Sequence, residues 1–273
     1  MELTDRGKRD ARFGSRIRKL RTDRGLTLRA LSEQLDGYAY SYLSRVERGI
    51  QPASRALVAA LDAFYEAQGA LSELHSLERD VQFARYSREY VRLERSARRI
   101  EVFTSSIIPG LLQTREYATD LFRTGLPAAD REDVAAKVAA RIERQAILDG
   151  EDPPYYWAVM DEAALMRPIA GSGMRAQLKR LLAACDRPRT EIQVLPWHQG
   201  LHPLLGGSLT LLTMSNGALW AHVESFSSGQ TVGSDEDGEK VIEQRTRYDV
   251  ARSMALSTRE SAVLIRRYLE ESE

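Results

Sequence analysis

The sequence contains a single cysteine and no long apolar run, and both scarcities narrow the class of protein. Cys185 has no second cysteine with which to form a disulfide inside the chain. No stretch approaches the roughly 20 apolar residues that a membrane-spanning helix needs. The start, MELTDRGKRD, lacks the apolar core of a secretion signal. We therefore expect a cytoplasmic protein that does not enter a membrane.

The net charge of the whole chain is zero, but charge is distributed unevenly along it. The 273 residues include 39 basic and 39 acidic residues, which argues against a globally cationic nucleic-acid binder. Between Arg6 and Arg55, however, 13 Lys and Arg residues stand against 5 Asp and Glu residues, whereas between Glu151 and Glu273 there are 13 against 17. A basic N-terminal segment can neutralise DNA phosphates while the remainder of the chain stays neutral or acidic. The length allows two domains.

Short amphipathic helices are predicted along the N-terminal part of the chain. Apolar residues recur at helical spacing over Ala11–Arg24, and Gly25 ends this first helix. Thr27 is in the position to cap a second short helix, and a glycine-containing turn then leads into a third helix over Ser41–Gly49. A further apolar repeat follows over Leu57–Phe64. Four to five helices in so short a segment suit a compact, mainly α helix-turn-helix domain.

The third predicted helix, SYLSRVERG, has an apolar side and a polar side. Its apolar stripe consists of Leu43, Val46 and Ile50, and its polar stripe of Ser41, Ser44, Arg45 and Arg48. A helix of this kind, preceded by a turn and another short helix, can lie in the major groove of DNA and contact base edges. An ordinary surface helix is the alternative interpretation of this stretch alone.

The segment RIRKLRTDRGLTLRALSEQLDGYAYSYLSRVERGIQP resembles the helix-turn-helix domain of the phage-repressor-like (XRE) family of transcription regulators. The Arg-x-x-Arg of the first helix, the Gly-Leu-Thr that follows it and the Ser-Arg-x-Glu-Arg-Gly run carry the resemblance. One departure is Leu28, which stands where many members have a glutamine that contacts phosphates or supports the reading helix. We assign residues 1–66 to this domain.

The resemblance implies roles for individual residues. The candidates for base contacts are Tyr40, Ser41, Ser44 and Arg45. Arg45 is the strongest of them, because a guanidinium can bond O6 and N7 of guanine together. The candidates for phosphate contacts, which set affinity without reading sequence, are Arg48, Arg55 and Thr27. The resemblance also implies that Arg21 and Glu47 pair inside the domain, in a structural role.

The segment Leu71–Val102 is dense in charge, contains no proline or glycine, and repeats its apolar residues at helical spacing. We predict a charged helical connector over residues 67–101, with His75 at its surface. Residues 102–273 are predicted to form an α+β domain with a small sheet. Its expected strands are Tyr155–Met160, Glu191–Leu195, Ser208–Thr213 and Leu219–Glu224. Its expected helices are Thr114–Arg123, Arg131–Asp149, Met174–Ala184, Gly238–Met254 and Thr258–Glu271.

Four short elements of this second domain, PGLLQT, RIERQ, DEAAL and VLP, carry another resemblance. They resemble the DUF5753-type domain that follows the repressor-like domain in a large family of regulators from high-GC bacteria. That family is described as antitoxin-like, and its members are often encoded beside a very small partner protein. The resemblance implies an architecture and little about mechanism.

An enzyme is the least favoured interpretation. His198 and His202 have helical metal-ligand spacing, but they lie in a loop with prolines and a glycine, so we predict no metal site. Asp161-Glu162 is interpreted as the start of a helix, and Cys185 as an inert thiol without a nearby histidine. The turn Gly171–Gly173 lacks the Lys-Ser/Thr of a phosphate-binding loop. Trp157, Trp197 and Trp220 are interpreted as core residues in preference to ligand contacts. We predict no catalytic residue and no cofactor.

The sequence therefore predicts a sequence-specific DNA-binding transcription regulator. One reading helix recognises too few bases for genomic selectivity, so we expect a homodimer on a palindromic operator in double-stranded DNA. The C-terminal domain would then serve dimerisation and either sensing or partner recruitment. Two alternatives remain open: an antitoxin-like scaffold that binds a small partner protein encoded nearby and regulates its own expression, and a repressor that responds to an unknown small-molecule effector.

Overall fold

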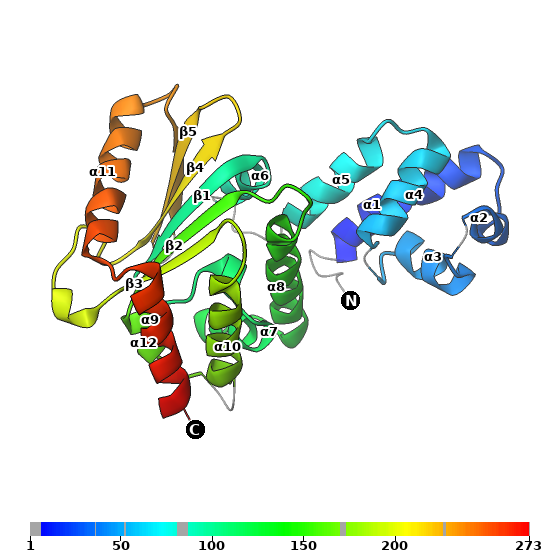
Figure 1. Ribbon diagram of the computed structural model, residues 1–273. Helices are drawn as coiled ribbons and strands as arrows, with labels where there is room; N and C mark the ends of the chain where they lie inside the picture. Colours follow the sequence, from blue (N-terminus) through cyan, green and yellow to red (C-terminus); the bar gives the residue numbers. More distant parts are fainter. Residues whose placement is uncertain are drawn as a thin grey trace. The chain divides into compact units, whose positions relative to one another are not determined.

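The computed structural model describes residues 7–35, 37–51, 53–80, 87–169, 173–225 and 228–272, and it leaves the side chains of residues 7–12, 55 and 76–80 undescribed. The chain divides into two compact units, Met1–Gln82 and Phe83–Glu273 (Figure 1). Each unit has its own apolar core, and each is described by itself.

The first unit is helical throughout its described part. Its helices are α1 (Gly7–Asp23), α2 (Leu28–Gln34), α3 (Tyr40–Glu47), α4 (Arg55–Tyr65) and α5 (Ala70–Asp80). They enclose one core, which includes Phe13, Ile17, Leu31, Leu43, Val46, Leu57, Leu61 and Leu71. The mainly α helix-turn-helix fold predicted from the sequence is confirmed.

Helix α5 belongs to this core, which differs from the prediction of a connector beginning at residue 67. Leu71 is buried in the core, and His75, predicted at the surface, is also buried. The His75 ring lies 5.1 Å from the ring of Phe13, and its Nε2 is 3.0 Å from the carbonyl oxygen of Ala53. The helical spacing of this segment was correct, but its apolar side packs onto α1 and α4 where a solvated helix was expected.

The carboxylate of Asp62 in α4 fixes the start of α5. It accepts hydrogen bonds from the backbone N–H of Leu71 at 3.1 Å and of Ser72 at 2.7 Å, and another from the Ser72 hydroxyl. Burial opposes ionisation of this carboxyl, but the hydrogen bonds outweigh it and hold the pKa of Asp62 below its usual value. The carboxylate therefore satisfies the first backbone donors of α5, as a capping side chain does.

The second unit is built on a six-stranded mixed sheet with the order β3-β2-β1-β4-β5-β6. Its strands are β1 (Ala97–Thr104), β2 (Tyr155–Asp161), β3 (Thr190–Leu195), β4 (Ser208–Met214), β5 (Leu219–Glu224) and β6 (Gly229–Gly233). Strands β1, β2 and β3 run parallel, whereas β4, β5 and β6 join as antiparallel neighbours beginning at β1. The strand pairing thus changes from parallel to antiparallel at β1. The predicted α+β class is confirmed, and the four predicted strands lie at β2, β3, β4 and β5.

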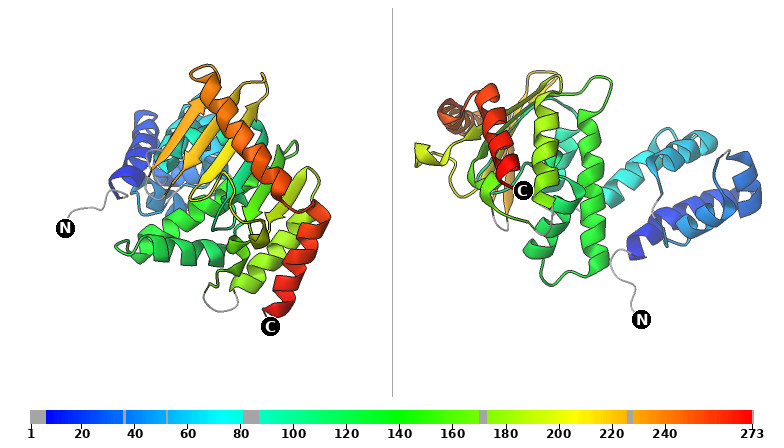
Figure 2. Two further views of the ribbon diagram at one scale, coloured as in Figure 1. Left: turned by 90° about the vertical axis from the view of Figure 1, so that its left-hand side faces the viewer. Right: turned by 60° about the horizontal axis from the view of Figure 1, so that its bottom comes forward.

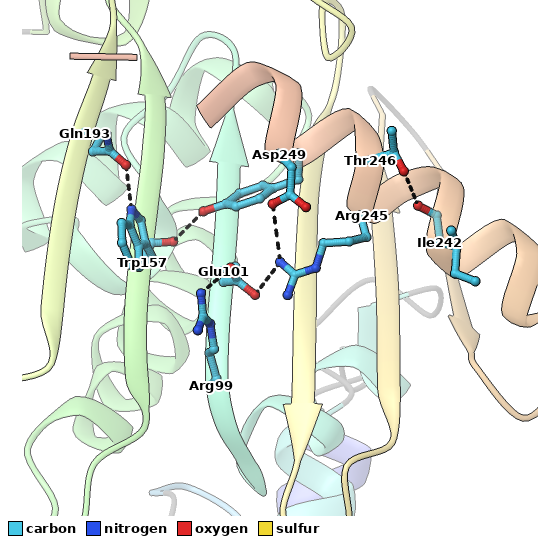
Figure 3. Close-up of polar contacts among 9 residues, drawn as sticks. Arg99, Glu101, Trp157, Gln193, Ile242, Arg245, Thr246 and Asp249 are labelled. Carbon is cyan, nitrogen blue, oxygen red and sulfur yellow. Dashed lines mark hydrogen bonds and ion pairs between the residues drawn. The ribbon is translucent and has the colours of Figure 1, made fainter. Parts of the chain in front are cut away.

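Strand β1 corrects the prediction of a helix up to Val102. Its sequence, ARRIEVFT, alternates charged and apolar residues, and the charged residues suggested a solvated helix. In the structure Glu101 is fully buried between two guanidinium groups, with Arg99 at 2.8 Å and Arg245 at 2.7 Å (Figure 3). Paired cations make a buried carboxylate tolerable in the middle of a sheet. The edge strand β6, GQTVG, was also missed.

Helices cover both faces of the sheet (Figures 1 and 2). One face carries the larger core, to which α6 (Arg88–Glu94), α7 (Arg115–Gly125), α10 (Gly173–Cys185) and α12 (Thr258–Glu271) contribute, and α8 (Arg131–Arg144) packs on α7 through a smaller apolar cluster. The other face is covered by α11 (Gly238–Met254), whose Val241, Tyr248 and Ala251 join the second core. Helices α11 and α12 have the predicted bounds, and Ser257 and Glu260 form the capping box of α12. Shorter elements are η2 (Gly110–Leu112), η3 (Gln145–Leu148), α9 (Ala163–Met166) and η4 (Trp197–Gln199).

Candidate nucleic-acid interface

Helices α2 and α3 are joined by a short turn that fixes their relative direction. Gly37 has a φ of 87°, a left-handed conformation that glycine adopts without steric cost. The Ser32 hydroxyl of α2 donates a hydrogen bond of 2.7 Å to the carbonyl oxygen of Tyr38, and the Tyr38 N–H donates one of 3.2 Å to Leu35. These contacts hold the turn against α2, so that α3 begins at a defined angle.

The inner side of α3 packs closely against α1. Leu43 and Val46 are buried in the core. Gly14 of α1 lies so near that a Cβ atom there would be 2.5 Å from the carbonyl oxygen of Val46. Ile50, predicted on the same apolar stripe, is instead 56% exposed, because α3 ends at Glu47 and Gly49 turns the chain with a φ of 68°.

The structure brings Arg21 of α1 and Glu47 of α3 together in a buried two-bond contact. Arg21 Nε donates to Glu47 Oε1 at 2.7 Å, and Arg21 Nη2 donates to Glu47 Oε2 at 2.9 Å. Arg21 Nη1 also donates to the carbonyl oxygen of Leu26 at 2.7 Å. The hydrogen bond to Glu47 raises the pKa of Arg21, against the opposing effect of burial. The guanidinium thereby ties α3 to α1 and to the turn before α2.

The outer side of α3 presents the four residues predicted to contact bases. Tyr40, Ser41 and Arg45 are exposed, and Ser44 is half-buried. Ser41, Ser44 and Arg45 are three and four positions apart, so they occupy one side of the helix. This side offers hydroxyl and guanidinium groups to solvent.

Gln51 is a functional candidate that the sequence analysis did not identify. Its side-chain oxygen accepts a hydrogen bond of 2.8 Å from Arg45 Nε. Nε is the one guanidinium nitrogen not needed for a two-bond contact made through the terminal amino groups. Gln51 therefore restrains Arg45 while leaving those amino groups available for guanine. Only its nearness to Arg45 in the sequence pointed to such a contact.

The three residues predicted at phosphates differ in their surroundings. Arg48 is exposed and stands at the C-terminal end of α3. Thr27 is exposed, but its hydroxyl oxygen already accepts a hydrogen bond of 3.1 Å from the backbone N–H of Ala30, as the N-cap of α2. The side chain of Arg55, the first residue of α4, lies outside the described part of the structure.

The acidic and histidine residues after β2 and β3 form structural contacts. His202 is buried, and its Nε2 lies 3.2 Å from Asp161 Oδ2 while its Nδ1 accepts a hydrogen bond from Leu204 N–H. Asp161 also accepts from the backbone N–H of Ala163 at the start of α9, near the predicted helix start. Glu162 accepts hydrogen bonds of 2.7 Å from the Trp197 N–H and from the Tyr268 hydroxyl. His198 lies apart in η4.

Among the residues that the structure describes, no group of three or more His, Cys, Asp or Glu side chains could hold a metal ion. In the same part of the chain, no helix has the length and apolarity to cross a membrane. Cys185 is half-buried, and burial together with Asp186 and Glu191 raises the pKa of its thiol to about 11, so the thiol is protonated at neutral pH. Gly173 begins α10, whereas residues 171 and 172 lie outside the described residues.

The three tryptophans do not form one group. Trp157 is partly buried on β2, where its Nε1 donates to Gln193 at 2.8 Å (Figure 3) and the Arg252 guanidinium lies 4.0 Å from its ring centroid. Trp220 is partly buried against the larger core. Trp197 is 68% exposed, so its interpretation as a core residue was wrong.

Comparison with known families agrees with this division of the chain. A model described as a helix-turn-helix domain matches residues 12–74, and a model described as a domain of unknown function (DUF5753) matches residues 87–267. The first match spans α2, α3 and the exposed outer side of α3, and the second covers every strand of the sheet. Neither a curated protein nor a solved structure matches the chain.

Proposed function

Because the chain belongs to the DUF5753 family and joins that domain to a helix-turn-helix domain, we propose that it regulates transcription by reading a specific operator as a homodimer. The observation that carries the proposal is the outer side of α3. There Arg45 is exposed, and Gln51 restrains its Nε so that the terminal amino groups remain available to a guanine. The opposite side of α3 is fixed to α1 by Leu43, Val46 and Glu47.

The charge distribution supports DNA as the partner. The segment Arg6–Arg55, which contains α2 and α3, carries 13 basic against 5 acidic residues, so positive charge is concentrated around these two helices in a chain whose net charge is zero. One α3 helix contacts only a few base pairs, and two copies about one helical turn apart supply the selectivity that a genome demands. The palindromic operator and the homodimer follow from that requirement.

Selection of bound duplexes from a random library, at one stated salt concentration, tests the proposal directly. We expect an enriched motif with two inverted half-sites, and a protein–DNA complex with two chains per duplex by light scattering. Arg45→Ala should weaken binding to the selected operator by about 1–3 kcal/mol and relax the preference at one base pair of each half-site. Arg247→Ala, at an exposed position of α11, is a matched control that should bind like the wild type. Equal, weak binding to all duplexes would refute the proposal.

Partner recruitment is a second function that one feature favours. The loop after β3 exposes Trp197, Leu201 and Leu205, with Leu201 87% exposed, and the buried contact of His202 with Asp161 holds the loop in place. Exposed apolar residues on a fixed loop are typical of a protein-binding surface. Co-expression with a small protein encoded beside this one should give a complex of fixed stoichiometry. Leu201→Ser should dissociate it without changing DNA affinity, and absence of the complex would exclude the antitoxin-like role.

A further inference from the structure

One half of the larger-core face of the sheet is polar. The register pairs Val102 of β1 with Thr210 of β4, Thr210 with His222 of β5, and His222 with Thr231 of β6. The next row pairs Thr104 with Ser208 and Ser208 with Glu224. On β2 and β3 the same face carries apolar residues, namely Ala158, Met160, Ile192 and Val194, together with Tyr156 of β2. The polar residues therefore form a continuous patch over β1, β4, β5 and β6.

Helices α6 and α8 place ionisable groups over this patch. The Tyr90 ring of α6 stacks on the His222 ring, with 4.3 Å between centroids and 8° between planes. The Tyr90 hydroxyl donates to Glu94, and Arg144 Nε of α8 lies 2.7 Å from Glu94 Oε2. Glu94 is 1% exposed, so this carboxylate is buried among its partners. We call these groups, the strand residues beneath them, Arg141 of α8 and Tyr156 of β2 the polar cluster.

Several atoms of the polar cluster are shielded from solvent and have no hydrogen-bond partner. They are Thr104 Oγ1, Tyr156 Oη, His222 Nε2 and Arg141 Nε. Thr104, Tyr156 and His222 are each less than one-tenth exposed. Burial, and then the nearby Tyr90 and Glu94, raises the pKa of Tyr156. Unpartnered buried polar atoms are rare in folded proteins, and each calls for an explanation, of which a bound ligand is one.

The cluster also holds a cation without a carboxylate partner. Arg141 Nη1 donates to the side-chain oxygen of Gln113 at 2.9 Å, and no carboxylate among the described residues forms an ion pair with Arg141. Burial and the neighbouring Arg144 lower the pKa of Arg141 to about 10, so its guanidinium is charged at neutral pH. Burial and Arg144 also lower the pKa of His222 to about 4, so its imidazole is neutral. A guanidinium beside hydroxyls and a neutral imidazole is suited to a small anion with further polar groups.

We propose that the polar cluster is a binding site for a small organic anion, with Arg141 at its carboxylate or phosphate group and Thr104, Tyr156 and His222 at its other polar atoms. The cluster lies against β1, the strand at which the sheet changes from parallel to antiparallel pairing, and Thr104 is the last residue of that strand.

The regulatory consequence rests on the proposed DNA-binding function. Helix α6 is the first α-helix in the described part of the second unit, so Tyr90 and Glu94 stand close in the chain to the boundary between the two units. A ligand held under α6 contacts the element nearest to that junction. Such a ligand shifts operator affinity to the extent that it binds the DNA-competent state differently from the incompetent one.

Thermal unfolding of the full chain, followed by tryptophan emission, tests the site without DNA. All three tryptophans belong to the second unit, so their emission reports that unit. The probes are inorganic phosphate, ribose 5-phosphate and citrate, each titrated as its sodium salt at constant ionic strength. We expect at least one of them to raise the unfolding midpoint saturably, and the arm that does so distinguishes a phosphate ligand from a carboxylate ligand. If none does, the proposal is overturned.

Two variants connect the binding to the polar cluster. Thr104→Val keeps the shape of the side chain and removes a hydroxyl that has no partner, so the ligand-free protein should be as stable as the wild type or more stable. Arg141→Lys keeps the charge but loses the planar fork. Each variant should bind the active probe at least tenfold more weakly by calorimetry, whereas Arg247→Gln, at an exposed position of α11, should bind it normally. Equal affinity in all three variants would place the probe elsewhere and refute the site.

A final comparison separates failure of the site from failure of the proposed function. Arg45→Ala should bind the active probe with wild-type affinity although its operator binding is impaired. If the probe binds but no duplex is selected, the proposed anion site is supported and the proposed sequence-specific DNA binding is refuted. If an operator is selected and the probe does not change its affinity, the regulatory link is refuted.

Discussion

Removing the carboxylate of Glu47 should destabilise the first unit more than the loss of an ordinary surface charge. In Glu47→Leu, the Arg21 guanidinium would lose both hydrogen bonds, of 2.7 and 2.9 Å, while its side chain is only 11% exposed. An uncompensated buried charge costs about 3–5 kcal/mol, whereas loss of an exposed pair costs less than about 1 kcal/mol. The bond from Arg21 to Leu26 remains in this variant, so the turn before α2 should persist.

The measurement uses the uneven distribution of tryptophan between the units. Far-UV circular dichroism follows both units during urea unfolding, whereas tryptophan emission follows only the second. We expect Glu47→Leu to move the dichroism transition of the first unit to lower urea and to leave the emission transition unchanged. Hydrogen exchange of α3 peptides should show the same loss of protection.

A double variant determines whether the loss comes from the stranded charge. Arg21→Met combined with Glu47→Leu removes both charges and retains apolar volume, so most of the stability should return. A residual loss of about 1 kcal/mol is expected from the bond to Leu26. If Glu47→Leu alone changes stability by less than about 1 kcal/mol, the pair is not a buried tie between α1 and α3 and the reasoning is refuted.

Three further outcomes are expected. Gly14→Ala should lose about 1–3 kcal/mol in the dichroism transition, because its Cβ would meet the Val46 carbonyl oxygen at 2.5 Å; unchanged stability would contradict that approach. Arg48→Ala should weaken binding to every duplex by the same factor and reduce the salt slope of binding by about 1. A loss that depends on the base sequence would instead assign Arg48 to base contacts. The pKa of His222 is about 4 in the native protein and 6.5 ordinarily, so the unfolded chain binds the extra proton between these values and stability falls as pH drops through them. Between pH 7 and 4 the wild type should lose about 3 kcal/mol more than His222→Phe, measured by urea unfolding, and parallel losses would place the titration elsewhere.

The parts of the fold predicted from the sequence are those whose pattern is local. Strands β2 to β5 have runs of apolar and β-branched residues, and α11 and α12 have helical repeats with Asp237 and Ser257 at their starts. Strand β1 escaped prediction because Glu101 is neutralised partly by Arg245, which is 144 positions away in the sequence. The spacing of residues within a short stretch of sequence cannot indicate an ion pair with a residue so far away in the chain.

The two candidate sites differ in the same way. The outer side of α3 follows from spacing within a few residues, so Tyr40, Ser41, Ser44 and Arg45 could be named in advance, although their contacts with DNA stay a prediction. The polar cluster draws on α6, α8 and five strands, and its strand members are brought together only by the register of the sheet. In the sequence its threonines look like ordinary strand residues, and its arginines look like part of a solvated helix.

The position of β1 also has a mechanical consequence. The chain leaves the first unit, passes through α6 and enters the sheet at a strand that is hydrogen-bonded on both sides, to β2 and to β4. If the first unit were bound to DNA, tension along the chain would act in shear on two sets of backbone hydrogen bonds at once, those between β1 and β2 and those between β1 and β4. The connection from the first unit therefore enters the sheet at an interior strand, which is harder to separate from its neighbours than an edge strand.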